Sequence, residues 1–176
     1  MPLLKDNAFI ADSWNHLGTD DVLPDTGNII VPFDRLTKEW DYLVKFPGVL
    51  GVRLANTTRI QDLQPYLSQL GLVIVPFPAF NDGRAYSLAR QLRLDGYRGE
   101  IRAMGNVLPD QVQFMHQVGI DSYEVTERFS LDDWKRASRQ MSLAYQRGLY
   151  RPVGEREVWS ERHQGFEPWE EQPHAG

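Results

Sequence analysis

The stretch LVIVPFPAFNDGRAYSLARQL, residues 72–92, decides the fold. It opens with the most apolar run in the chain, residues 72–75, which is typical of a buried strand in a parallel sheet. Two prolines and an Asn-Asp-Gly turn end that strand. A helix is then predicted from Gly83 to about Leu94, because its apolar residues recur at the spacing of one buried face. A buried strand that passes through a loop into a helix is the repeating unit of α/β proteins.

The same unit recurs on both sides of this stretch. Strands are predicted at residues 29–32, 50–54, 100–104 and 122–125, and helices at 34–45, from Asp62, from Pro109 to Val118 and after Ser130. Asp62 is preferred as a helix start because it places Pro65 in the first turn, where no backbone hydrogen bond is lost. Asp133 forms a capping box with Ser130 at the last helix.

Five short strands alternating with helices predict an α/β fold with a mostly parallel five-stranded sheet and flanking helices. A doubly wound three-layer sheet is the preferred arrangement, and an open half-barrel with sequential strand order is the alternative, because spacing alone does not fix the strand order. The N-terminal segment LLKDNAFIADSW predicts a short hairpin. Residues 1–150 are expected to form a single domain, and residues 151–176 an extended or disordered acidic tail that carries aromatic residues.

Composition and charge exclude several classes of protein. The net charge is −5, which argues against a nucleic-acid-binding surface. No apolar run approaches the roughly 18 residues of a membrane span. Asp6 and Asp12 interrupt the N-terminal apolar residues, so we expect no secretory signal and a cytoplasmic protein.

The residues that most often bind redox cofactors and metals are scarce. The chain contains no cysteine, so it offers no disulfide, no thiolate ligand for an iron–sulfur cluster and no cysteine nucleophile. Its four histidines show neither HxH nor HExxH spacing, so no metal site is predicted. No GxGxxG, GxxxxGK[ST] or GxSxG motif occurs either, and no cofactor is evident from the residues.

The loop at residues 76–84 is the best candidate for a binding site. In open parallel sheets, ligands bind beyond the carboxyl ends of the strands, where loops lead into helices. Free backbone N–H groups at the start of this helix, with Arg84 beside them, could bind phosphate, sulfate or a carboxylate. The alternative is that Asn81 or Asp82 is simply the helix cap, and the negative charge of Asp82 would repel an anion.

Arginines are concentrated near the same helix. Tyr86, Arg90 and Arg93 share one helix face, which predicts either a docking face for an acidic partner or a solvated surface. Arg102 alternates with apolar residues in a strand, so its charge is expected to be buried and paired. Glu124, on the adjacent predicted strand, is the expected partner.

Three segments together carry a family resemblance. They are FPAFNDGRAYSLARQLR (77–93), GYRGEIRAMGNVLPDQ (96–111) and VGIDSYEV (118–125). Over residues 28–126 the chain resembles the bacterial domain of unknown function 934 family, described as probable oxidoreductases involved in sulfite reduction. By that resemblance the family motif is carried by Asp82, Gly83, Arg84, Tyr86, Ser87, Arg90, Arg93, Arg102, Gly105, Asp110 and Gln111. Asn106 departs from the family's tendency toward Asp at that position.

The resemblance implies a role in sulfite reduction and sulfate assimilation. The first hypothesis is an accessory protein that docks on sulfite reductase or its electron donor. The alternatives are an oxidoreductase that binds a flavin or a small sulfur oxyanion, and an interaction scaffold without a ligand. No catalytic residue is predicted. The candidate ligand- or partner-binding residues are Asn81, Asp82, Gly83, Arg84, Tyr86, Ser87, Arg90, Arg102, Asn106 and Asp110.

Overall fold

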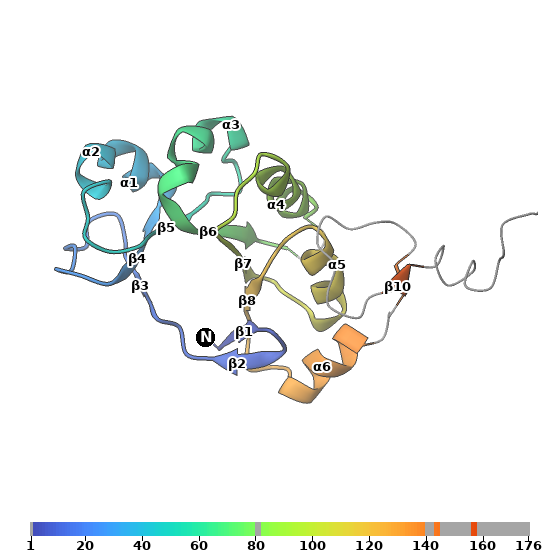
Figure 1. Cartoon of the computed structure of the whole chain (residues 1–176). Coiled ribbons are helices and arrows are strands. Elements are labelled where there is room, and N and C mark those ends of the chain that lie inside the picture. Colours follow the sequence, from blue (N-terminus) through green and yellow to red (C-terminus); the bar gives the residue numbers. More distant parts are fainter. Residues whose placement is uncertain (1, 80–81, 140–142, 145–155, 158–176) are drawn as a thin grey trace, which may run out of the picture.

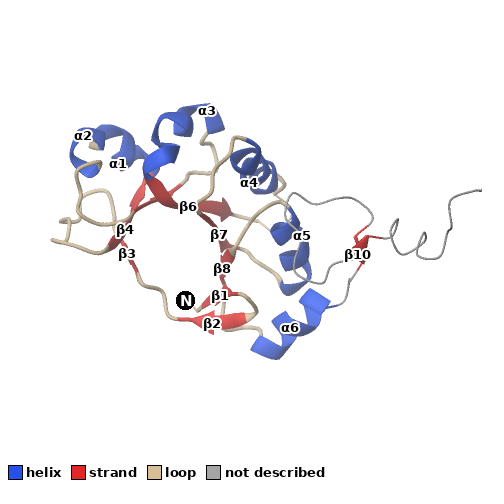
Figure 2. Ribbon diagram, in the orientation of Figure 1, coloured by secondary structure: helices blue, strands red, loops and turns tan. Residues whose placement is uncertain are grey.

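A curled sheet of eight strands organises the chain. The computed structural model describes residues 2–79, 82–139, 143–144 and 156–157. Figures 1 and 2 show the strands following an arc, with helices along its outer side. The strand order is β2-β1-β8-β7-β6-β5-β4-β3. Its parallel centre consists of β4 (Asn28–Pro32), β5 (Leu50–Arg53), β6 (Leu70–Phe77), β7 (Glu100–Gly105) and β8 (Ser122–Glu124).

This arrangement is the half-barrel that the sequence allowed as an alternative. All five predicted strands form, and the mostly parallel sheet with flanking helices is confirmed. From β4 to β8 the neighbours in the sheet follow the order of the chain. A doubly wound sheet instead reverses its strand order near the middle, so the preferred three-layer arrangement is not the one observed.

The helices between the strands are short. The described elements are α1 (Phe33–Lys38), α2 (Trp40–Leu43), α3 (Ile60–Leu63), the 3-10 helix η1 (Gln64–Gln69), α4 (Arg84–Leu94), the 3-10 helix η2 (Pro109–Gln111), α5 (Val112–Gln117) and α6 (Leu131–Arg139). The helix predicted over 34–45 is divided at Glu39, whose backbone leaves the helical region at φ −112°. Pro65 lies in the first turn of η1, where it interrupts no helical hydrogen bond.

Both faces of the sheet are apolar at its centre. On the outer face, Val73 and Val75 of β6 are fully buried in the main core. On the concave face, Leu72 and Ile74 form a second buried cluster with Ile30 of β4, and Trp14 packs against this cluster. Side chains on both faces of β6 are therefore removed from water. This is why its sequence is a continuous apolar run and does not alternate between apolar and polar residues.

The N-terminal hairpin predicted from the sequence is confirmed, and it extends the sheet. β1 (Leu3–Lys5) pairs antiparallel with β2 (Ala8–Ile10) and, on its other side, with β8. The turn uses Asp6 and Asn7 at φ 50° and 58°, a left-handed conformation that these two residue types tolerate well. The hairpin thus covers an edge that β8 would otherwise expose.

Three residues join the two edges of the sheet. β2 is one edge strand, and β3 (Trp14–His16), which pairs parallel with β4, is the other. Residues 11–13, here called the strap, connect them (Figure 1). Four residue steps span at most about 14 Å, so the two edges must approach each other. The strap therefore holds the sheet in its curl.

The C-terminal part is described only in places. Ser130 and Asp133 form the predicted capping box at the start of α6, with the Asp133 N–H 3.2 Å from Ser130 Oγ. Beyond α6 the structure describes a parallel pair, β9 (Leu143–Ala144) and β10 (Arg156–Glu157). Apart from β10, the tail predicted at 151–176 lies outside the described residues. Among the described helices, none combines the length and apolar character that a membrane span requires.

Candidate functional site

An open groove lies at the carboxyl ends of β5 and β6. Its volume is about 870 Å³, and one of its walls is the first half of α4. Ile60, Ala85 and Leu88 provide apolar surface in the groove, while Asn56, Arg84 and Ser87 provide hydrogen-bonding groups. This is the position at which open parallel sheets bind ligands, and Pro76, Gly83 and Arg84 of the loop predicted from the sequence line the groove.

Asp82 holds the loops around this groove together. Its Oδ2 accepts hydrogen bonds from Asn56 Nδ2 (3.1 Å) and Arg84 Nη2 (2.7 Å). Its Oδ1 accepts from the backbone N–H of Arg84 (3.1 Å) and from Arg84 Nε (2.9 Å). These hydrogen bonds, above all those from the Arg84 side chain, hold the pKa of Asp82 well below its usual range. The ionised Asp82 carboxylate therefore links the β5–α3 loop to the start of α4.

This geometry bears on the anion-binding interpretation. α4 begins at Arg84, and Asp82 already accepts the first N–H of that helix. The Arg84 guanidinium is paired with the same carboxylate, although 63% of its side chain remains exposed. A small anion would therefore meet a fixed negative charge at the helix start. The exposed part of Arg84 is better placed to contact a larger molecule lying along the groove.

The remaining candidate residues divide between the groove and its surroundings. Gly83 and Ser87 line the groove together with Arg84. Arg90 is exposed farther along α4 and is not among the groove residues. Asn81 lies outside the described residues.

Asn106 lies at the end of the neighbouring strand, β7. Its side chain donates to the carbonyl of Pro78 (2.9 Å), and its backbone N–H donates to the carbonyl of Phe77 (2.8 Å). Gly105 makes this close approach possible, because its φ is +111° and a Cβ there would lie 2.5 Å from the Phe77 oxygen. Asn106 thus positions the loop that follows β6, and its side chain is committed to that loop.

Tyr86 in the first turn of α4 lies near Asp110 of η2. The Tyr86 ring packs on Phe77 (5.1 Å between centroids) and on the exposed Phe114 of α5 (4.9 Å). Burial raises the pKa of Tyr86, and the nearby charge of Asp110 raises it further. Tyr86 therefore serves as packing between α4 and α5, with its phenol protonated at neutral pH.

The predicted basic face of α4 is not continuous. Arg93 points inward, where it pairs with Asp121 and donates to the carbonyls of Tyr97 and Gly99. Arg102 is 1% exposed on the concave face of the sheet. Arg90 and Arg98 remain exposed, while Arg93 and Arg102 belong to two separate internal networks.

The concave face carries a charged cluster that only partly follows the prediction. Arg102 lies 3.6 Å from Glu124, its predicted partner. Closer contacts come from Asp12 on the strap (2.8 Å) and from Glu100 (3.2 Å), which also binds Lys5 (2.7 Å). The contact between Asp12 and Arg102 could not be predicted from the sequence, because it depends on the strap, which joins the two edge strands of the curled sheet. The presence of charged Arg102 in an apolar strand was the feature of the sequence that indicated a buried ion pair.

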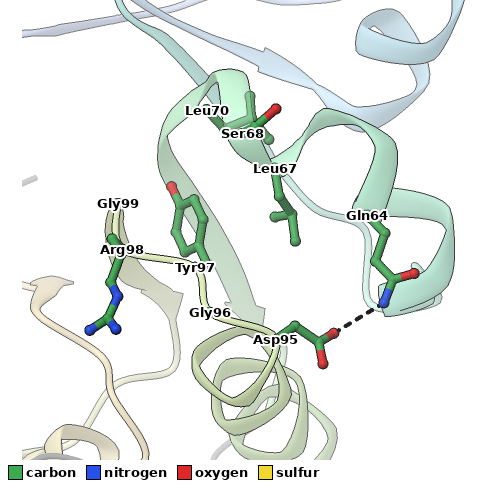
Figure 3. A pocket seen from close by; sticks show the side chains of 9 residues that line it. All are labelled: Gln64, Leu67, Ser68, Leu70, Asp95, Gly96, Tyr97, Arg98 and Gly99. Atoms are coloured by element: carbon green, nitrogen blue, oxygen red, sulfur yellow. Dashed lines mark hydrogen bonds between the residues drawn. The ribbon is translucent and has the colours of Figure 1, made fainter.

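A second pocket lies at the opposite, amino-terminal end of the strands (Figure 3). Its volume is about 530 Å³, and Gln64 reaches across it to Asp95 (3.3 Å). The hydroxyl of Tyr97 is buried beside it and has no hydrogen-bond partner among the described residues. This pocket is separate from the motif-bearing loop, and its Gln64–Asp95 contact ties η1 to the end of α4.

Comparison with known proteins gives a family but no characterised relative. No curated protein matches the chain. The model of a family of bacterial proteins of unknown function (DUF934) matches residues 51–154, more than half of the chain, which include the groove, α4 and Arg102. The chain therefore belongs to this family of bacterial proteins of unknown function.

Proposed function

We propose that this protein is an accessory factor of sulfite reduction, which docks on sulfite reductase or on its electron donor in the cytoplasm. The family resemblance supplies the link to sulfite reduction. The observation that carries the docking role is the groove, because three residues of the family motif, Gly83, Arg84 and Ser87, line it.

The chemistry of the groove favours recognition of a polypeptide over catalysis. Asp82, which is hydrogen-bonded to the groove residues Asn56 and Arg84, is ionised and accepts four hydrogen bonds, so it is a poor general base. Apolar surface flanked by exposed hydrogen-bonding groups is typical of a site for an extended segment of a partner. Arg84 then contributes its exposed N–H groups to the partner while Asp82 fixes its orientation.

A deletion strain tests this proposal in vivo. A bacterium that lacks the gene should grow poorly when sulfite or sulfate is its sole sulfur source, and the wild-type gene should restore growth. Arg84→Ala should restore it only in part, because the groove loses its exposed cation. Arg98→Ala is the matched control, since Arg98 is also exposed but lies at the other end of the sheet. Full restoration by Arg84→Ala would contradict docking through the groove.

A second function has one observation in its favour. A groove of about 870 Å³ at the carboxyl ends of parallel strands has the size and position of many cofactor sites. The alternative is therefore an oxidoreductase that binds a flavin or a small sulfur oxyanion there. Yellow absorbance of the purified protein, or a thermal shift of several degrees with flavin mononucleotide or sulfite, would support it. A colourless protein with no shift, which still restores growth, would favour the accessory role.

A further inference from the structure

The charged cluster on the concave face leaves one buried carboxylate oxygen without a hydrogen bond. Arg102 directs Nη1 to Asp12 Oδ2 (2.8 Å) and directs Nε and Nη2 to Glu100 Oε1 (3.4 and 3.2 Å). Glu124 is 9% exposed, and its Oε1 accepts no hydrogen bond in the described structure. Its separation of 3.6 Å from Arg102 Nη1 is an ion-pair contact only. A buried carboxylate oxygen left in this way is costly unless another group binds it.

His16 faces this oxygen across a short gap. Its Nε2 lies 3.9 Å from Glu124 Oε1, and it is hydrogen-bonded to Asp12 Oδ2 at 2.9 Å. The three potential ligand atoms all lie within 4.8 Å of one another. Two ligands each about 2.1 Å from one metal ion are about 3.0–3.9 Å apart for bond angles of 90–135°. The separations of His16 Nε2 from Glu124 Oε1 and from Asp12 Oδ2, 3.9 and 2.9 Å, lie close to the two ends of this range.

The charges of the cluster leave room for a cation. Asp12, Glu100 and Glu124 contribute three negative charges, and Lys5 and Arg102 contribute two positive charges. With a neutral His16 the net charge is therefore −1. The side chains of Asp12 and His16 are 23% and 33% exposed, so an ion can enter from solvent.

We propose that Asp12, His16 and Glu124 bind a divalent transition-metal ion such as zinc on the concave side of the sheet, beside the strap. One imidazole and two carboxylates are a ligand set that suits zinc better than magnesium or calcium, which prefer oxygen alone. Three protein ligands leave a coordination position for water. Arg102 acts as a positioning residue, because it holds Asp12 through Oδ2, and the metal would take the place of the hydrogen bond between His16 Nε2 and the same oxygen. Histidine spacing in the sequence does not reveal the site, because Glu124 joins Asp12 and His16 only through the fold.

Zinc binding to the untagged, metal-free full chain tests this site independently of any role in sulfite reduction. Isothermal titration with zinc chloride should give one saturable site, and magnesium chloride should give none. Glu124→Gln and His16→Gln should each weaken zinc binding by at least about tenfold. The matched control is Asp62→Asn, an exposed carboxylate on α3. This control should bind zinc like the wild-type protein.

Two results would overturn the proposal. One is that Glu124→Gln and His16→Gln bind zinc as tightly as the wild-type protein, and the other is that the wild-type protein shows no saturable zinc binding. Circular dichroism establishes that each variant is folded. If a variant does not fold, anomalous scattering from zinc-soaked crystals of the wild-type protein decides the question. A zinc peak between the three side chains supports the site, and zinc bound only elsewhere refutes it.

Discussion

Replacing Arg102 by methionine should destabilise the protein strongly at neutral pH. Methionine fills part of the space of the buried side chain but leaves the neighbouring carboxylates without their shared cation. Removing one partner of a buried ion pair costs about 3–5 kcal/mol. Glu100 and Asp12 retain side-chain exposures of 18% and 23%, so water screens part of the repulsion, and we expect the lower end, about 3 kcal/mol.

Urea denaturation at pH 7 measures this loss directly. With a slope of about 2 kcal/mol per molar urea, the midpoint should fall by about 1.5 M. Arg90→Met, which removes an exposed arginine from α4, is the control and should change stability by less than about 0.5 kcal/mol. A midpoint for Arg102→Met within about 0.3 M of wild type would refute the view that Arg102 compensates the buried carboxylates.

The loss should also depend on pH in a defined direction. Burial alone would raise the pKa of Glu100, but hydrogen bonds from Lys5 and Ser122 and the charges of Lys5 and Arg102 outweigh it, so this pKa is lowered in the folded protein. The stabilisation from ionised Glu100 is therefore complete above its unfolded pKa and disappears as the pH falls toward the lower folded value. The difference between wild type and Arg102→Met should consequently shrink between about pH 5 and pH 3. A constant difference would contradict this assignment.

Three further predictions concern the loops and caps. Gly105→Ala should lower stability by at least about 2 kcal/mol, because φ is +111° and the new Cβ would lie 2.5 Å from a carbonyl oxygen; an unchanged urea midpoint would be inconsistent with that conformation. Ser130→Ala should cost about 1 kcal/mol through loss of the α6 cap, measured in the same assay, and no loss would mean that this helix end is stabilised by other contacts. Asp82→Asn should lower the melting temperature at pH 7 but flatten its decline between pH 5 and pH 3, because the lowered pKa of Asp82 makes its contribution disappear as the pH falls. Equal slopes for the two proteins would argue against the Asp82–Arg84 pair.

The sequence predicted the elements of the fold better than their arrangement. β6 was recognisable because it is apolar on both faces, and the hairpin because the segment LLKDNAFIADSW alternates loosely between apolar and polar residues. Strand order was left open because a run of βα units has the same spacing whether the strands follow in sequence or reverse. The division of the first helix at Glu39 was not predicted, because no proline or glycine lies at that point in the sequence.

The candidate site was predicted in place but not in detail. The loop after β6 was found because ligands of parallel sheets bind at carboxyl ends, and the groove lies there. The inward turn of Arg93 could not be predicted, because its partner Asp121 is distant in sequence. The meeting of Asp12 with Arg102 likewise depends on the strap, whose path is set by the curl of the entire sheet.

Binding to purified sulfite reductase tests the central claim most directly. Ser87→Trp places a bulky side chain in the groove, and Leu94→Trp places the same side chain at an exposed position on α4 outside it. Biolayer interferometry should show that wild type and Leu94→Trp bind the reductase or its electron donor alike, while Ser87→Trp binds at least about tenfold more weakly, a loss of about 1.4 kcal/mol. Equal binding by all three proteins would contradict docking through the groove, and no binding by the wild-type protein to either partner would contradict the accessory role itself.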